Sequence, residues 1–220
     1  MSDTDKVRQH FTRSAEAFDS LYSEEKMSLL WHLINRWFRS AIYERFILSM
    51  NHVSKYKLKT ALDVGCGSGR YASALAELGL KKIVGIDLSP KMLELATDYT
   101  RGVQGANEIF KFVCCDFIEF HTEETFDVVI AMGLFDYIKD PIPVLAKMRT
   151  LSNHSVIASF PYTSFYRTPI RKIRYYFKQC PVYSYDPVKI QSFCSGAGFE
   201  RHEVVKTEGA GADYFVSFFK

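Results

Sequence analysis

The chain has no CxxC pair, no secretory signal, no apolar run long enough to span a bilayer and no large excess of charge. With 28 basic and 25 acidic residues, the net charge of +3 is too balanced to predict nucleic-acid binding. We therefore expect a cytoplasmic protein with reduced thiols and no metal site, and we expect no nucleic-acid target. The cysteines form an odd, scattered set of five, Cys66, Cys114, Cys115, Cys180 and Cys194.

The N-terminal part is helical in pattern. Apolar residues recur every three or four positions over residues 5–22 and again over residues 25–50, which contain no glycine or proline. A polar linker, residues 51–59, follows. We expect residues 1–57 to form a helical extension and residues 58–220 to form one α/β domain. Arg45, in the second helical stretch, is interpreted as part of a solvated face, with contact to an anionic ligand as the alternative.

Strand and helix patterns alternate from residue 60 onward, which requires right-handed crossovers and a mainly parallel sheet. The last two strands have no helix between them and should pair as a hairpin. The predicted fold is α/β, with a doubly wound, seven-stranded, mainly parallel sheet, one antiparallel strand and an N-terminal helical lid. Strands are expected near 60–64, 82–86, 110–114, 126–131, 155–160, 199–205 and 213–219, and helices near 69–79, 90–100, 141–150 and 186–197.

A glycine-rich turn follows the first strand and is the strongest functional signal in the chain. Gly65, Gly67 and Gly69 allow a sharp turn that brings backbone N–H groups close to a ligand. A dinucleotide site requires its third glycine at position 70, which is arginine, and Asp63 would place a negative charge near a pyrophosphate. The turn therefore suits a ligand that is cationic where it meets the loop.

The runs LDVGCGSGRY and IVGIDLSPKMLELA resemble the class I S-adenosylmethionine-dependent methyltransferases, over roughly residues 58–220. The resemblance implies S-adenosyl-L-methionine as cofactor and a small-molecule methyl acceptor, anionic, aromatic or lipid-like. It also implies an N-terminal helix that acts as a lid. A NAD-dependent dehydrogenase and a non-catalytic S-adenosylmethionine-binding protein are the alternatives, and either a monomer or a homodimer is compatible with the sequence.

Three aspartates follow successive strands at the edge of the sheet where ligands bind in such folds. By resemblance, Asp63 would orient the methionyl ammonium, Asp87 the ribose diol and Asp116 the adenine amino group. Each aspartate taken alone fits a helix cap or a turn equally well. The resemblance also implies that further cofactor contacts come from Gly65, Cys66, Gly67, Gly69, Leu88, Met92, Phe117, Met132 and Gly133.

Candidate catalytic residues are few. Asp136 is the best-placed acid for a general base, although ordering the loop before Pro141 is the alternative role. His10 is the histidine that would reach the site from the lid, and Tyr22 would approach from the same segment. Because the sulfonium is an activated donor, alignment of the nucleophile supplies much of the rate, and no strong acid–base pair is required.

The substrate side is expected in an insertion, residues 161–185, and in the lid. Basic residues recur at helical spacing in the insertion, with no acidic residue among them. Such a helix, near residues 165–179, would cover a pocket for an anionic substrate, rest on a membrane surface as a peripheral contact, or bind a partner; a merely solvated face is the alternative. The candidate substrate residues are Phe18, Tyr22, Tyr137, Tyr162, Arg171 and Arg174.

Overall fold

The computed structural model describes residues 2–19, 29–163, 180–208 and 213–220, with all their side chains except those of residue 14 and of residues 16–19 and 29–41. The strands are β1 (Thr60–Val64), β2 (Lys82–Asp87), β3 (Phe110–Cys114), β4 (Phe126–Ala131), β5 (Ser152–Pro161), β6 (Arg201–Lys206) and β7 (Asp213–Phe219). The helices are α1 (Asp3–Asp19), α2 (Leu29–Tyr56), α3 (Arg70–Glu77), α4 (Pro90–Thr100), α5 (Ala106–Ile109), α6 (Pro141–Leu151) and α8 (Pro187–Gly196).

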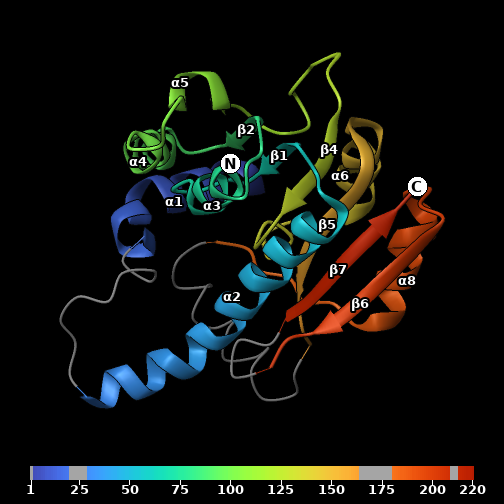
Figure 1. Cartoon of the computed structure of the whole chain (residues 1–220). Coiled ribbons are helices and arrows are strands. Elements are labelled where there is room, and N and C mark those ends of the chain that lie inside the picture. The colour runs from blue at the N-terminus through green and yellow to red at the C-terminus, as the bar shows by residue number, and fades with distance from the viewer. Residues whose placement is uncertain (1, 20–28, 164–179, 209–212) are drawn as a thin grey trace.

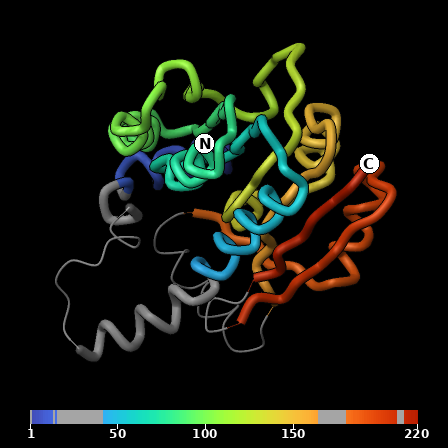
Figure 2. The backbone as a smooth tube through the Cα atoms, viewed as in Figure 1, coloured from blue at the N-terminus to red at the C-terminus, as the bar shows by residue number. Residues whose placement is uncertain are grey.

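The strands form one seven-stranded sheet in the order β3-β2-β1-β4-β5-β7-β6 (Figure 1). The first five strands in chain order pair in parallel, and β7 runs antiparallel to both β5 and β6. Figure 2 shows the β6 and β7 hairpin at the opposite side of the sheet from α4. The predicted doubly wound sheet with a C-terminal hairpin is therefore confirmed.

The sheet has a separate apolar core on each face, because alternate residues of its strands point to opposite sides. In β1, Leu62 and Val64 belong to the core beneath α6 and α8, whereas Ala61 belongs to the core beneath α2 and α3. The central strands β1 and β4 are thus buried on both sides, whereas the edge strand β6 is mostly exposed. This arrangement leaves the ends of the strands, rather than the faces of the sheet, for a ligand.

The helix α2 ends later than expected, at Tyr56. Residues 51–56, expected to be a linker, continue the helix because they are packed on the sheet. Val53 is buried in the core, and His52 is hydrogen-bonded to Ser155 (2.8 Å) and Ser217 (3.2 Å). Burial and the nearby His154 lower the pKa of His52 to about 4. The end of α2 is therefore anchored to the sheet through His52 and Val53.

Strand β5 begins three residues before the expected position, and the short helix α5 was not expected. The proposed division of the chain at residue 57 stays a prediction. The basic stretch near residues 165–179, with Arg171 and Arg174, and also Tyr22, lies outside the described residues. Among the helices that the structure describes, none is both long and apolar enough to cross a membrane.

Candidate active site

The glycine turn ties the end of β1 to the end of β2. The backbone N–H groups of Gly65 and Cys66 both donate to the carbonyl oxygen of Ile86, at 2.7 and 3.0 Å. The next N–H, that of Gly67, donates to Oδ2 of Asp87 at 3.0 Å. Gly65 and Gly67 have φ angles of 75° and 53°, in the left-handed region where a Cβ is disfavoured. The turn is thus held as a rigid cradle at the edge of the sheet.

Gly69 makes the close approach that we expected of a glycine at position 70. Its φ is 77°, and a Cβ at this position would lie 2.9 Å from the Cβ of Ala96 in α4. Glycine here therefore allows the start of α3 to approach α4 closely. Arg70 begins α3 instead, and its guanidinium lies 5.0 Å from the centre of the Tyr99 ring.

Asp63 carries a buried carboxyl group at the end of β1. The residue is 2% exposed, and its Oδ2 atom has no hydrogen-bond partner among the residues that the structure describes. Burial, together with the charge of Asp87, raises the pKa of Asp63 to about 7. An uncompensated buried carboxyl is costly unless a cation or a donor pairs with it. This atom therefore marks the position where a ligand would supply positive charge.

Asp87 is oriented by the backbone on both sides. Its Oδ1 accepts a hydrogen bond from the N–H of Ser89 at 2.8 Å, and its Oδ2 accepts the one from Gly67. Burial raises the pKa of Asp87, although these two hydrogen bonds act in the opposite direction. Each carboxylate oxygen has a further lone pair, so the group is able to accept hydrogen bonds from a ligand diol.

The other predicted cofactor residues differ in how much surface they offer. Met92 and Phe117 are 1% and 6% exposed, so both are mainly core residues, whereas Leu88 is half-buried. Oδ1 of Asp116 accepts a hydrogen bond from the N–H of Ile118 at 2.9 Å, the geometry of an Asx turn. The contacts of Leu88, Met92, Phe117 and Asp116 with an adenine ring stay predictions.

Arg45 is a site residue that the sequence interpretation assigned wrongly to a solvated face. It is buried, and its Nη1 donates to Oδ2 of Asp213 at 2.9 Å, at the start of β7. A Cβ added to Gly133 would lie 3.4 Å from Nη2 of Arg45, and the Gly133 N–H donates to Oγ of Ser159 at 2.8 Å. The guanidinium therefore lies beside the ends of β4 and β5. Its position in an apolar stretch, between Ile42 and Phe46, was the available signal.

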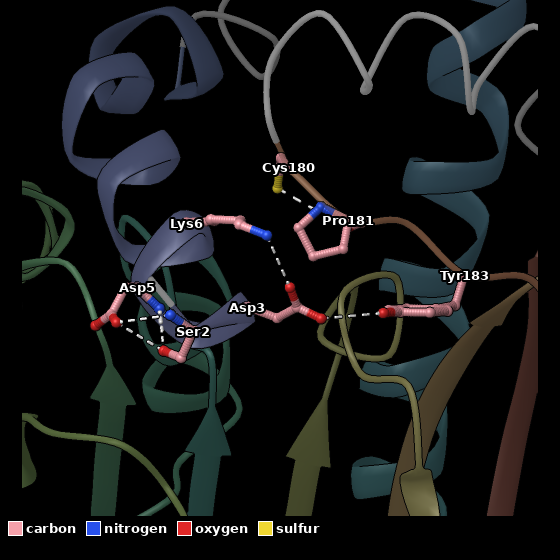
Figure 3. A network of polar contacts seen from close by, with 7 residues as sticks. All are labelled: Ser2, Asp3, Asp5, Lys6, Cys180, Pro181 and Tyr183. Atoms are coloured by element: carbon pink, nitrogen blue, oxygen red, sulfur yellow. Dashed lines mark hydrogen bonds and ion pairs between the residues drawn. The ribbon is translucent and has the colours of Figure 1, made fainter.

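Helix α1 lies across the strand ends, as expected of a lid. The ring of Phe11 meets that of Tyr137 edge-to-face at 5.2 Å, and Thr12 Oγ1 is 3.2 Å from Oγ of Ser89, after β2. The first turn of α1 reaches the other side, where the Tyr183 hydroxyl donates to Asp3 Oδ2 at 3.4 Å (Figure 3). The helix thus bridges the loops that follow β2 and β4.

The loop after β4 carries several predicted residues, and residues 181–185 cover it. The N–H of Tyr183 donates to the carbonyl oxygen of Asp136 at 2.8 Å, and the Tyr185 hydroxyl donates to the carbonyl oxygen of Ile138. Burial, with the Asp136 charge adding to it, raises the pKa of Tyr185 well above its usual value. The structure thus brings Asp136 and Tyr137 under the lid together.

Other predicted residues lie apart from this group or outside the described side chains. The His10 ring lies 5.3 Å from that of Phe11, on the lid. Tyr162 packs against Tyr214, with the Lys206 ammonium 4.2 Å from its ring centre. The Phe18 side chain is not described. Among the described residues, no three His, Cys, Asp or Glu side chains are grouped as metal ligands.

The structure thus combines a mainly parallel sheet with a hairpin edge, a glycine turn after β1, acidic residues at the ends of β1 and β2, and a third one after β3, which are the features that carry the resemblance to class I methyltransferases. Residues 62–156 match the family model described as a methyltransferase domain. These residues run from β1 into β5, so the matched segment contains the turn and all three aspartates. The predicted resemblance to methyltransferases is therefore confirmed over this segment.

Curated methyltransferases match part of the chain at about 30% identity. A ubiquinone biosynthesis O-methyltransferase of Albidiferax ferrireducens is 31% identical over 102 residues, which are 46% of this chain and 40% of that protein. A tRNA U34 carboxymethyltransferase of Shewanella sp. (strain ANA-3) is 33% identical over 98 residues, which are 44% of this chain and 29% of that protein. The similarity thus spans less than half the length of these relatives.

Solved structures match over nearly the whole chain at low identity. Magnesium protoporphyrin IX methyltransferase from Synechocystis PCC 6803, with bound SAH, superposes with a TM-score of 0.80 and 17% identity, covering 97% of this chain and 98% of that one. The N-methyltransferase NodS from Bradyrhizobium japonicum, in complex with S-adenosyl-L-homocysteine, gives a TM-score of 0.65 and 17% identity over 96% and 97%. These likenesses establish the fold, including its N-terminal helices.

Proposed function

We propose that this protein binds S-adenosyl-L-methionine at the strand ends and transfers its methyl group to a small-molecule acceptor held beneath α1. The observation that carries the proposal is the buried carboxyl of Asp63, whose Oδ2 has no partner among the described residues. A ligand ammonium group at this atom would compensate the cost of burying the charge. The methionine part of S-adenosylmethionine carries such a group.

The same electrostatics argue against a dinucleotide. Asp63 and Asp87 place two carboxyl groups beside the glycine turn, where a pyrophosphate would otherwise lie. Repulsion between these carboxylates and the negatively charged pyrophosphate would raise the free energy of the complex. The residue after Gly69 is also arginine rather than the glycine of a dinucleotide turn. The NAD-dependent dehydrogenase is therefore disfavoured.

Each part of the cofactor has a proposed partner. Asp63 would hold the ammonium, and Arg45 lies close enough to Gly133 to meet the methionyl carboxylate. Asp87, oriented by two backbone N–H groups, would accept the ribose hydroxyls. Asp116 would accept the adenine amino group. The bound cofactor would supply a methyl group on a sulfonium, which is an activated donor.

The remaining work of the protein is to align the acceptor and exclude water. The edge-to-face pair of Phe11 and Tyr137 and the nearby Tyr183 line the underside of the lid. Aromatic walls of this kind favour a flat, aromatic acceptor. Asp136 is the proposed general base for an acceptor that must lose a proton, and its replacement by asparagine should lower kcat more than it raises KM for the cofactor.

The names of the relatives support a methyl acceptor of this kind without identifying it. Those names refer to ubiquinone biosynthesis, to tRNA U34 and to magnesium protoporphyrin IX. The porphyrin enzyme is one of the structural matches that cover nearly the whole of both chains, which supports a small molecule over tRNA. We accordingly propose a small aromatic acceptor.

Calorimetric titration with S-adenosylmethionine, S-adenosylhomocysteine and NAD⁺ tests the cofactor. We expect the first two to bind and the third not to bind. Asp87→Ala should weaken binding by about 100-fold, since it removes hydrogen bonds to a charged acceptor in a partly buried site. The matched control is Asp98→Ala, an exposed aspartate of α4 whose side chain pairs with Arg101. Tighter binding of NAD⁺ than of either adenosyl ligand would overturn the proposal.

Labelled-methyl transfer tests the reaction. The protein is incubated with methyl-labelled S-adenosylmethionine and with three fractions of a cell extract, containing small molecules, RNA or protein. We expect label in the small-molecule fraction only, lost in Asp87→Ala and retained in Asp98→Ala. Label in RNA would refute the acceptor class but not the cofactor. Binding without any transfer would indicate a non-catalytic S-adenosylmethionine-binding protein.

A further inference from the structure

Lys147 links helix α6 to the loop that follows β3. Its Nζ donates hydrogen bonds to the carbonyl oxygens of Ile118, at 2.7 Å, and Phe120, at 2.6 Å. The same ammonium lies 5.2 Å from the centre of the Phe117 ring. One side chain therefore contacts three of the four residues 117–120.

The loop that Lys147 holds is the one that carries Asp116. The N–H groups of Glu119 and Phe120 donate to the carbonyl oxygen of Asp116, at 3.0 and 3.1 Å, which makes residues 116–120 a single helical turn. A short turn of this kind is marginal alone, because fixing its backbone costs more than its few hydrogen bonds return. A cation at the C-terminal end of the turn, where carbonyl groups lack partners, stabilises it.

The turn also determines how the Asp116 carboxylate points. The N–H of Ile118 donates a hydrogen bond to Oδ1 of Asp116 at 2.9 Å, whereas Oδ2 accepts no hydrogen bond from the described residues. Ile118 thus links the two side chains: its N–H donates to Asp116, and its carbonyl oxygen accepts from Lys147. Loss of the ammonium would release this residue and with it the direction of the carboxylate.

We propose that Lys147 is a positioning residue that holds the 116–120 turn so that Asp116 recognises the amino group of the cofactor's adenine. The proposal rests on the proposed function. It makes the base specificity of the site depend on a side chain of α6 that lies behind the loop. Lys147 itself contacts Phe117 and two backbone carbonyls rather than the cofactor.

The burial of Lys147 is consistent with this role. Burial lowers the pKa of its ammonium, while the charges of Cys115 and Asp116 act in the opposite direction. A partly buried cation held between carbonyl groups and an aromatic ring loses mobility, which is what a positioning role requires.

The test compares two ligands that differ at the adenine amino group. S-adenosylhomocysteine carries this group, and S-inosylhomocysteine carries a carbonyl oxygen in its place. We expect the wild-type protein to prefer the adenosyl ligand by about 10-fold or more, the value of one hydrogen bond to a charged acceptor. Lys147→Met, which keeps the length of the side chain, should reduce the preference to below about 3-fold by weakening the adenosyl ligand alone.

Two further variants separate positioning from general stability. Lys147→Arg keeps the cation and should retain at least part of the preference, whereas Asp116→Ala should abolish it and leave nothing more for Lys147→Met to remove. Lys82→Met is the matched control, because Lys82 forms an exposed pair with Glu124 on β2. If Lys147→Met unfolds, Lys147→Gln, which keeps an N–H donor without the charge, takes its place in the same comparison.

Equal weakening of both ligands by Lys147→Met, or an unchanged preference, would overturn the positioning role. If the wild-type protein binds both ligands equally well, Asp116 does not recognise the amino group and the proposal also fails, with cofactor binding intact. Failure of the wild-type protein to bind either ligand would instead refute the proposed function. Calorimetry on the full chain distinguishes these results.

Discussion

Replacing Asp63 by asparagine tests the physical basis of the proposed site most directly. The substitution keeps the shape of the side chain and removes its charge. Burial holds the pKa of Asp63 at about 7, against an ordinary value of 3.8. At 1.36 kcal/mol per pKa unit, ionising this carboxyl in the folded protein costs about 4 kcal/mol of stability.

The sign of the pH dependence follows from the raised pKa. The unfolded chain loses the Asp63 proton near pH 4, whereas the folded chain keeps it until about pH 7. The free energy of unfolding of the wild-type protein therefore falls across this window and changes no further above it. Relative to Asp63→Asn, the wild-type protein should lose about 2–3 kcal/mol of stability between pH 5 and pH 8.

Urea unfolding of the ligand-free proteins at both pH values measures this difference. Subtracting the variant from the wild type removes the titration of groups that the two proteins share. Asp98→Asn, at an exposed site, should show a difference of less than about 0.5 kcal/mol between the two pH values. A wild-type minus Asp63→Asn difference that is equally pH-independent would refute the assignment of a buried, uncompensated carboxyl.

The same carboxyl makes cofactor binding depend on pH. An ammonium group at Oδ2 should lower the pKa of Asp63, so binding at pH 6.5 releases protons, which calorimetry in buffers of different ionisation enthalpy detects. Asp63→Asn should release no such protons and should bind more weakly, even where it is the more stable protein. Tight binding by this variant, with the wild-type proton release, would contradict a contact between Asp63 and the cofactor.

Three further variants probe the surroundings of the site. Arg45→Met should lower the free energy of unfolding by about 3–5 kcal/mol because it removes the guanidinium that pairs with the largely buried carboxylate of Asp213, and adding Asp213→Asn should restore part of this in denaturant melts; full additivity would argue against the pair. Phe11→Ala should raise KM for S-adenosylmethionine severalfold at an unchanged melting temperature, unless the lid contact with Tyr137 is dispensable. Gly69→Ala should lower the melting temperature, its left-handed backbone costing about 1–2 kcal/mol; an unchanged value would show that α3 and α4 readily separate.

Local patterns were sufficient to predict the sheet. Apolar strands alternating with amphipathic helices imply parallel pairing, and two strands without a helix between them imply the hairpin of β6 and β7. The glycine turn was also predictable from the sequence, because the left-handed backbone at Gly65 and Gly67 requires residues without a Cβ atom. The end of α2 was predicted wrongly because polar residues such as His52 are buried by a sheet that forms from distant segments.

The sequence by itself therefore determined the class of fold, the glycine turn and the three acidic strand ends, since each depends on residues near one another in the chain. Only the tertiary structure decided which side chains meet there. Arg45 pairs with Asp213 across 168 positions, and Tyr183 reaches Asp3 across 180. Such contacts follow from the order of the strands and the path of the helices, which no local pattern encodes.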